Sequence, residues 1–164
     1  MESPRTMQSS RAKELASDVG DHVDAFVEAV KPHLRGWLHL VMAPLALIGG
    51  LVLTSMAPTQ GGRIAAMVFT VTAGLLFATS ALYHRGSWGE KMGAALRRWD
   101  HANIFLIIAG SYTPFALMLP RSQAVTLLAT VWTGAILGVI FRVFWVDAPR
   151  WLYVPVYVAL GFVA

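Results

Sequence analysis

Three polar side chains lie at the borders of two long apolar segments, and their types suit metal and hydrolytic chemistry. Ser80 and His84 close one apolar run, and Asp100 opens the next, after the polar stretch "RGSWGEKMGAALRRW". Imidazole is the commonest metal ligand, and a carboxylate beside a metal-bound water can orient that water and accept its proton. A zinc ion can lower the pKa of its bound water to about 7. The three residues therefore define a candidate metal site.

The spacing of these residues has two interpretations. Ser80 and His84 are four residues apart, which places them on one face of a helix, and a short connection would bring Asp100 to the same place. Alternatively, the helix macrodipole favours a histidine at a helix C-terminus and an aspartate at a helix N-terminus, where Asp100 can cap the helix. Spacing alone leaves both interpretations open.

The composition is that of a protein built for lipid. Hydrophobic residues make up 56% of the 164 residues, charged residues 13%, and the mean hydropathy is +0.58. Soluble domains carry about a quarter charged residues. The net charge of +4 and pI near 9.9 are better explained by membrane orientation than by nucleic-acid binding, so the lipid bilayer is the expected partner, with no nucleic acid. The absence of cysteine excludes disulfides and thiolate ligands.

Long charge-free stretches predict an all-α polytopic membrane helix bundle. Each stretch is long enough to cross a bilayer, which takes about 20 residues. We expect about five spans, at roughly residues 37–57, 64–84, 100–119, 123–144 and 151–164. Gly134 and Gly138 form a small-xxx-small pair in the fourth of them, which indicates close contact with another helix.

Basic residues are divided unevenly between the two sides of these spans. Of the thirteen, eleven lie in the N-terminal segment and in the loops that follow the second and fourth spans, whereas Arg63 and Arg121 lie on the other side. By the positive-inside rule, the N-terminus and the loop from Arg85 to Trp99 are expected to be cytoplasmic. The predicted location is the inner cell membrane, with several passes.

The chain before the first span is a separate polar segment. Residues 1–11 are expected to be a disordered tail. Within residues 12–35, apolar residues recur every three or four positions and predict a cytoplasmic amphipathic helix, ended by Pro32. Because the polar face of this helix is acidic, we expect it to pack against the basic loops rather than bind anionic lipid. Residues 36–164 form the transmembrane bundle.

The last apolar run is too short to cross a bilayer. Its 14 residues, Trp151 to Ala164, rise by about 21 Å, whereas the hydrocarbon core is about 30 Å thick. A terminal carboxylate inside that core would be costly. We therefore expect the fifth span to be incomplete and the chain to be the front part of a longer protein.

Three stretches carry a family resemblance. They are "KPHLRGWLHL" before and into the first span, "SALYH" at the end of the second, and "RRWDHANIFLIIAGSYTPF" opening the third. Together they resemble the hemolysin III family, the bacterial branch of the progestin and adipoQ receptors, over roughly residues 31–164. The resemblance implies a bundle of seven membrane helices with a cytoplasmic N-terminus, of which this chain lacks the last two.

The resemblance also implies roles for the polar residues. His84 would be a ligand of a zinc ion, Asp100 would hold the zinc-bound water, and Ser80 would stand near the metal or the reacting carbonyl. The other two ligands in the family are a His-x-x-x-His pair in the seventh helix, and this chain has no such pair because its histidines end at His101. We therefore expect the full-length protein to bind zinc. This chain alone is not expected to build the three-histidine site.

Three functions follow from the resemblance. The superfamily includes alkaline ceramidases, which implies zinc-dependent hydrolysis of a lipid amide, with Asp100 and Ser80 as the catalytic residues. The family name instead implies a cytolytic membrane protein. The third function is that of a non-catalytic receptor or membrane-homeostasis protein, in which a lipid would be a ligand rather than a substrate.

Overall fold

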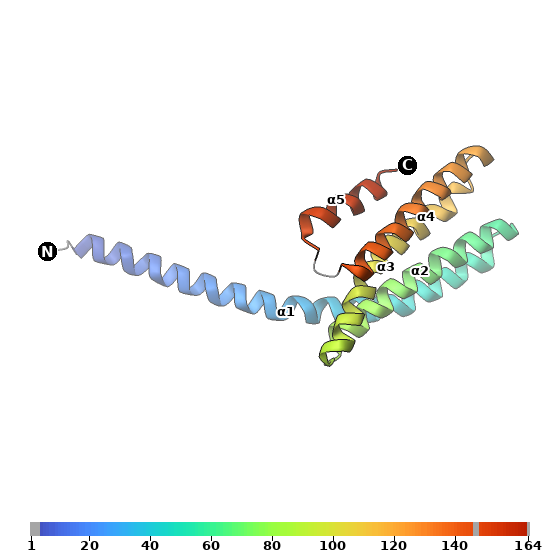
Figure 1. Cartoon of the computed structure of the whole chain (residues 1–164). Coiled ribbons are helices and arrows are strands. Elements are labelled where there is room, and N and C mark those ends of the chain that lie inside the picture. The colour runs from blue at the N-terminus through green and yellow to red at the C-terminus, as the bar shows by residue number, and fades with distance from the viewer. Residues whose placement is uncertain (1–3, 146–147, 164) are drawn as a thin grey trace.

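The computed structural model describes residues 4–145 and 148–163, with side-chain surroundings described for most residues from Asp18 onward. This part of the chain is all-helical, which confirms the predicted fold class of a helical membrane bundle (Figure 1). The helices, in chain order, are α1 (Pro4–Met56), α2 (Gln60–Arg85), α3 (Glu90–Ala116), α4 (Arg121–Phe144) and α5 (Arg150–Gly161).

Each helix packs against the next one along the chain, and α5 packs against α3 and α4. The connections are short, so successive helices of the bundle run in opposite directions (Figure 1). Consequently the end of α2, the start of α3 and the end of α4 all lie at one end of the bundle. This topology places the candidate site residues of α2 and α3 near one another.

Three helical segments are long and apolar enough to cross a membrane: Leu34–Met56 of α1, Gln60–Arg85 (α2) and Arg121–Phe144 (α4). They coincide with the first, second and fourth predicted spans. The helix α3 does not reach the same apolar character because buried polar residues, among them Asp100 and Asn103, interrupt its apolar sequence. The helix α5 has 12 residues. The chain is thus a multi-pass membrane protein with α3 as its most polar buried helix.

The helix α3 begins well before the predicted third span. Its first residue is Glu90 and its N-cap is Gly89, so Asp100 lies in the third turn rather than at the start. The predicted loop to Trp99 is therefore wrong, and the connection from α2 shrinks to residues 86–89. The physical reason is local helix propensity, since Ala, Leu, Met, Lys and Arg dominate residues 91–98.

The helix α1 is longer than predicted at its N-terminal side. It begins at Pro4, inside the segment expected to be disordered, and continues through Pro32, where a helix end was expected. A proline removes one backbone hydrogen bond, and the helix-forming residues on both sides maintain the helix across that gap. The N-terminal part of α1 projects away from the bundle, and the described contacts of α1 are with α2 (Figure 1). Most side chains of residues 12–35 lie outside the described residues, so the packing of this segment on the basic loops stays a prediction.

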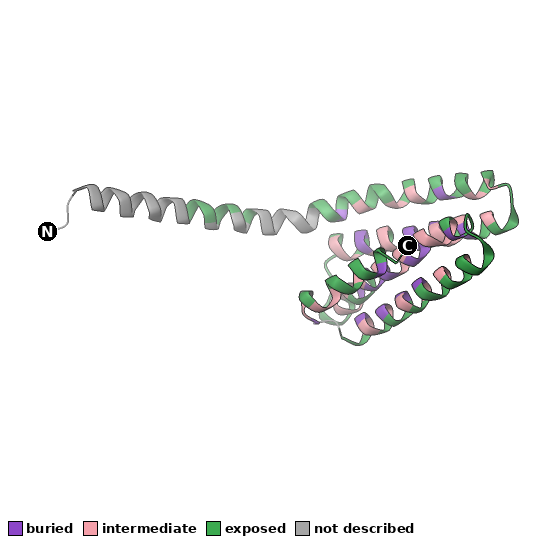
Figure 2. Ribbon diagram, turned by 90° about the horizontal axis from the view of Figure 1, so that it is seen from above, coloured by how far each residue is buried: buried purple, intermediate pink, exposed green. Residues whose placement is uncertain are grey.

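Small residues set the contacts among α3, α4 and α5. A Cβ atom at Gly138 would overlap the ring of Phe105, and one at Gly134 would lie 2.7 Å from Cδ1 of Leu160. The predicted close contact at these two glycines is confirmed, with α3 and α5 as the partners. Buried residues line the inner faces of the bundle (Figure 2), with a hydrophobic cluster of Phe105, Ala109, Val131, Ala135 and Leu160.

Candidate functional site

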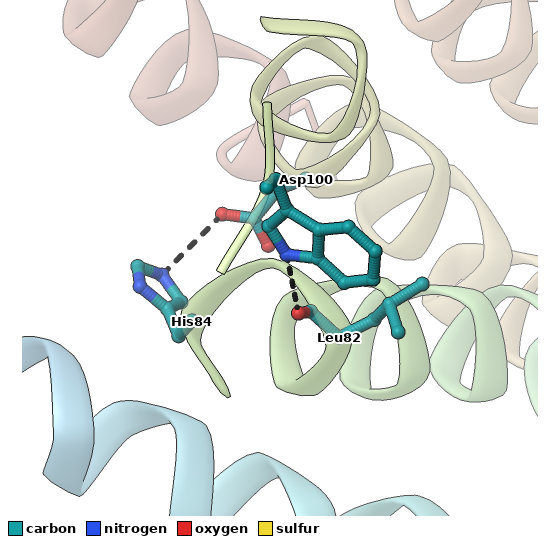
Figure 3. A network of polar contacts seen from close by, with 4 residues as sticks. Leu82, His84 and Asp100 are labelled. Carbon is teal, nitrogen blue, oxygen red and sulfur yellow. Dashed lines mark hydrogen bonds and ion pairs between the residues drawn. The ribbon is translucent and has the colours of Figure 1, made fainter. Parts of the chain in front are cut away.

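His84 and Asp100 face each other across the gap between α2 and α3 (Figure 3). Nε2 of His84 lies 3.7 Å from Oδ2 of Asp100. Both side chains are largely removed from solvent, with exposed fractions of 14% and 10%. The structure therefore brings together the two residues that the sequence predicted to meet.

The end of α2 is fixed by a backbone carbonyl that accepts two hydrogen bonds. The carbonyl of Leu82 accepts from the N–H of Gly86 at 3.2 Å and from Nε1 of Trp88 at 3.0 Å (Figure 3). The indole ring lies directly against Gly86, where any side chain would overlap it. His84 lies in the last turn of α2, and its imidazole points toward Asp100 of α3.

The position of Asp100 argues against a capping role. An N-cap residue accepts a hydrogen bond from an N–H in the first turn of its helix. Gly89 holds the N-cap position of α3, and Asp100 follows after nearly three helical turns, with an exposed fraction of 8%. The alternative interpretation of Asp100 as a simple helix cap is therefore wrong, and its carboxylate is directed at His84 instead.

Ser80 lies one turn before His84 in α2 and is 1% exposed. The spacing of four residues puts its hydroxyl on the same helical face as the imidazole. The three residues named from the sequence thus share one buried region between α2 and α3. Nearby, Asn103 of α3 donates a hydrogen bond of 3.1 Å to the carbonyl of Leu75, which ties the two helices together.

Nε2 of His84 is a buried polar atom with no hydrogen-bond partner in the described structure. The separation of 3.7 Å from Asp100 is too long for a hydrogen bond, and buried polar atoms are rarely left without a partner. A buried imidazole nitrogen of this kind can coordinate zinc, and the carboxylate that faces it can orient a zinc-bound water. The two residues fit that half of a metal site.

A complete ligand set is not present in the described part of the chain. Among the described residues, no group of three or more His, Cys, Asp or Glu side chains is close enough together to hold a metal ion. A zinc site takes about three or four protein ligands. The described residues therefore supply His84 and Asp100 but not the remaining ligands.

His39 of α1, a weaker candidate from the sequence, also approaches the site. It lies within electrostatic range of Asp100, and its Nδ1 is buried without a hydrogen-bond partner in the described structure. Its ring packs edge-on against Phe77 of α2, with centroids 5.4 Å apart. The only sequence signal was the "GWLH" spacing, which places Gly36 and His39 on the face of α1 that meets α2.

An apolar groove of about 810 Å³ runs between α1 and α2 beside the site. One end of the groove is formed by Arg85, the residue after His84, together with Gly86 and Trp88. The remaining lining is apolar: Leu40, Ala43, Pro44, Leu47, Ala78, Ala81 and Leu82. Its mostly apolar lining, with Arg85 among the lining residues, suits a hydrocarbon chain with a polar end.

These helices and their buried polar pair define a polytopic helical membrane protein. Residues 27–164 match the family described as Haemolysin-III related, and the chain belongs to this family. It is 39% identical over 102 residues to Hemolysin-3 of Bacillus cereus, covering 62% of this chain and 46% of that relative.

A second relative, the Hemolysin-3 homolog of Bacillus subtilis (strain 168), is 37% identical over 95 residues, covering 57% of this chain and 44% of the relative. The matches thus span a little under half the length of both curated relatives. No solved structure matches the chain significantly.

Proposed function

We propose that, in the full-length protein, His84 is a zinc ligand and Asp100 orients the zinc-bound water, for the hydrolysis of a lipid amide. The observation that supports this proposal is the unpartnered Nε2 of His84, which faces the Asp100 carboxylate at 3.7 Å in a buried setting. A helix cap would instead place the carboxylate at the start of α3, where Gly89 is the N-cap.

Zinc, when bound, would polarise a carbonyl and lower the pKa of its water. Asp100 would accept the proton of that water, and its low exposure keeps bulk water from competing for the carboxylate. Ser80 would donate a hydrogen bond to the oxyanion that forms on the substrate carbonyl. The remaining zinc ligands would come from residues beyond those described here, which is consistent with the greater length of the Bacillus relatives.

A lipid substrate suits the surroundings of this pair. The groove between α1 and α2 offers about 810 Å³ with mostly apolar walls, and it ends at Arg85, next to His84 in the chain. An acyl chain lying in this groove would keep its amide near the level of His84. The polar end of the groove would accommodate the headgroup.

Turnover of a fluorescent ceramide by the zinc-loaded full-length protein tests the proposal. His84→Ala and Asp100→Asn are expected to abolish turnover, and Ser80→Ala to reduce it by about 10²–10³-fold, as for the loss of one oxyanion donor. His22→Ala is the matched control, because His22 lies 3.7 Å from Asp18 but is 82% exposed. Turnover that persists in His84→Ala would refute the assignment.

The names of the two Bacillus relatives favour a second candidate function, membrane lysis. This function predicts leakage of dye from phospholipid vesicles on addition of the protein. Leakage of equal rate with His84→Ala would separate lysis from the zinc-dependent chemistry. A receptor function would instead preserve zinc binding without turnover or leakage.

We also propose that the N-terminus lies in the cytoplasm and the chain in the inner cell membrane. The topology supports this orientation because one end of the bundle collects the end of α2, the start of α3 and the end of α4. These segments carry most of the basic residues outside α1: Arg85, Lys91, Arg97, Arg98 and Arg142. Basic residues collect on the cytoplasmic side of membrane proteins.

A further inference from the structure

Pro44 interrupts the backbone hydrogen bonding of α1 inside the membrane-spanning segment Leu34–Met56. Proline has no N–H, so the carbonyl of Leu40, four residues earlier, lacks the donor that normally occupies it in a helix. Within a bilayer such a carbonyl needs another donor, because lipid tails offer none. The side-chain hydrogen bonds described for α1 and α2 go to other carbonyls.

The freed carbonyl lies on an accessible face of α1. Leu40 and Pro44 are one turn apart on the same helical face, and both line the apolar groove between α1 and α2. A helix carbonyl points along the axis toward the residue four positions later, so the carbonyl of Leu40 points toward the proline ring. Both residues are exposed, Leu40 at 39%. A molecule in the groove can therefore reach this acceptor from the bilayer.

The freed carbonyl is also level with the candidate site. Gly36 of α1 lies against His84 of α2, and the two helices run in opposite directions (Figure 1). Leu40 follows Gly36 by one turn, and Ser80 precedes His84 by one turn, so Leu40 and Ser80 lie at the same height along the bundle. Ala81, next to Ser80 in the chain, also lines the groove.

The groove thus combines apolar walls for an acyl chain with one hydrogen-bond acceptor for the linkage of that chain. An amide linkage carries an N–H that can donate to a carbonyl, whereas an ester linkage carries no donor at this position. A hydrogen bond from the amide would occupy the freed carbonyl, and an ester would leave it unpaired. Leaving a polar group unpaired is the stronger basis for discrimination between two ligands of equal shape.

We propose that the carbonyl of Leu40, freed by Pro44, accepts a hydrogen bond from the amide N–H of a bound N-acyl lipid. The groove thereby selects amide-linked over ester-linked acyl chains, and Pro44 is a specificity-determining residue. The choice of occupant rests on the proposed function, whereas selective binding needs neither zinc nor turnover. Failure of selection and failure of hydrolysis are therefore separate results.

Competitive binding to the purified 164-residue chain in maltoside micelles tests this selection. N-palmitoylethanolamine and its ester isostere, 2-hydroxyethyl palmitate, differ only in the N–H group that the ester replaces by oxygen. Each lipid is titrated against a bound fluorescent fatty acid. The amide is expected to bind about 3–10-fold more tightly than the ester, as for one hydrogen bond. Equal affinities would overturn the proposal without any variant.

Pro44→Ala supplies the missing N–H and so occupies the carbonyl of Leu40 within the helix. This variant is expected to fold, because it gains a helical hydrogen bond, and to bind the amide no more tightly than the ester. An amide preference that persists in Pro44→Ala would contradict the proposal. Pro114→Ala is the matched control, since Pro114 also lies inside a helix but outside the groove lining, and it should keep the preference of the parent.

Ala78→Phe locates the bound lipid. Ala78 is an exposed residue of the groove lining, so a phenyl group there should weaken the binding of both lipids. Val71→Phe, at a position of the same helix that is 58% exposed and outside the lining, is the control and should bind both. Unchanged binding in Ala78→Phe would overturn the proposal. Amide selection without ceramide turnover in the full-length protein would refute the proposed function alone.

Discussion

Gly36 of α1 lies directly against His84 of α2. A Cβ atom at Gly36 would come within 3.2 Å of the Cβ of His84 and 2.8 Å of the Cγ of Arg85. Arg85 in turn stacks on Trp37 of α1, with its Cζ 4.2 Å from the ring centroid. The glycine thus allows α1 to hold the last turn of α2 from one side, while Asp100 faces His84 from the other.

Gly36→Ala is expected to displace His84 and to weaken zinc binding. The added methyl group forces the two helices apart, at about 1–3 kcal/mol of folding stability. Gly49→Ala in the same helix is the control, since a Cβ there meets nothing within 4 Å. Thermal unfolding and zinc titration of both variants check the prediction. If Gly36→Ala and Gly49→Ala have the same unfolding midpoint and the same zinc affinity, Gly36 is not in close contact with His84.

Asp100→Asn preserves the shape of the side chain and removes its charge. If Asp100 orients a zinc-bound water, the affinity for zinc should fall by about 10–100-fold. Asp18→Asn provides a matched control, because Asp18 lies at the same 3.7 Å from a histidine but is 73% exposed. Competition with a chromogenic chelator measures the zinc affinity of both variants. Equal zinc affinities of Asp100→Asn and Asp18→Asn would exclude a role for Asp100 at the metal.

Periodicity and charge predicted the first, second and fourth spans and the meeting of His84 with Asp100, because lipid imposes long apolar helices and short connections. The start of α3 was predicted wrongly. Good helix formers extend this helix back to Glu90, through a charged stretch whose composition resembles that of a loop. Charge counting grouped Arg142 with the basic residues of the loop after the fourth span, because a sequence does not distinguish a buried arginine from an interfacial one. His39 reaches the site because α1 packs on α2, and the spacing of Gly36 and His39 was a weak signal for that contact.

Gly138→Ala is expected to destabilise the contact between α3 and α4. A methyl group at this position overlaps the ring of Phe105, which is fully buried, so the rings and helices must shift. The expected loss is about 1–3 kcal/mol of folding stability. Gly161→Ala, with open space around the added Cβ, is the control. Unfolding by SDS titration measures the difference, and equal midpoints would show that the contact is looser than described.

The absence of cysteine makes the orientation directly testable. Ser87→Cys lies in the exposed turn between α2 and α3, and Gln123→Cys lies at the exposed start of α4, at the other end of the bundle. With a cytoplasmic N-terminus, a membrane-impermeant maleimide added to intact cells should label Gln123→Cys and not Ser87→Cys. The reverse pattern would invert the proposed topology.

Zinc affinity of the purified full-length protein shows whether His84 is a metal ligand. His84→Ala and His22→Ala should be compared by chelator competition, since both remove an imidazole that lies 3.7 Å from an aspartate. His84→Ala is expected to lower the zinc affinity by more than the roughly 10–100-fold that follows the loss of an orienting group, and His22→Ala to leave it unchanged. Equal zinc affinity in the two variants would contradict the claim and leave the His84–Asp100 pair as a structural contact between α2 and α3.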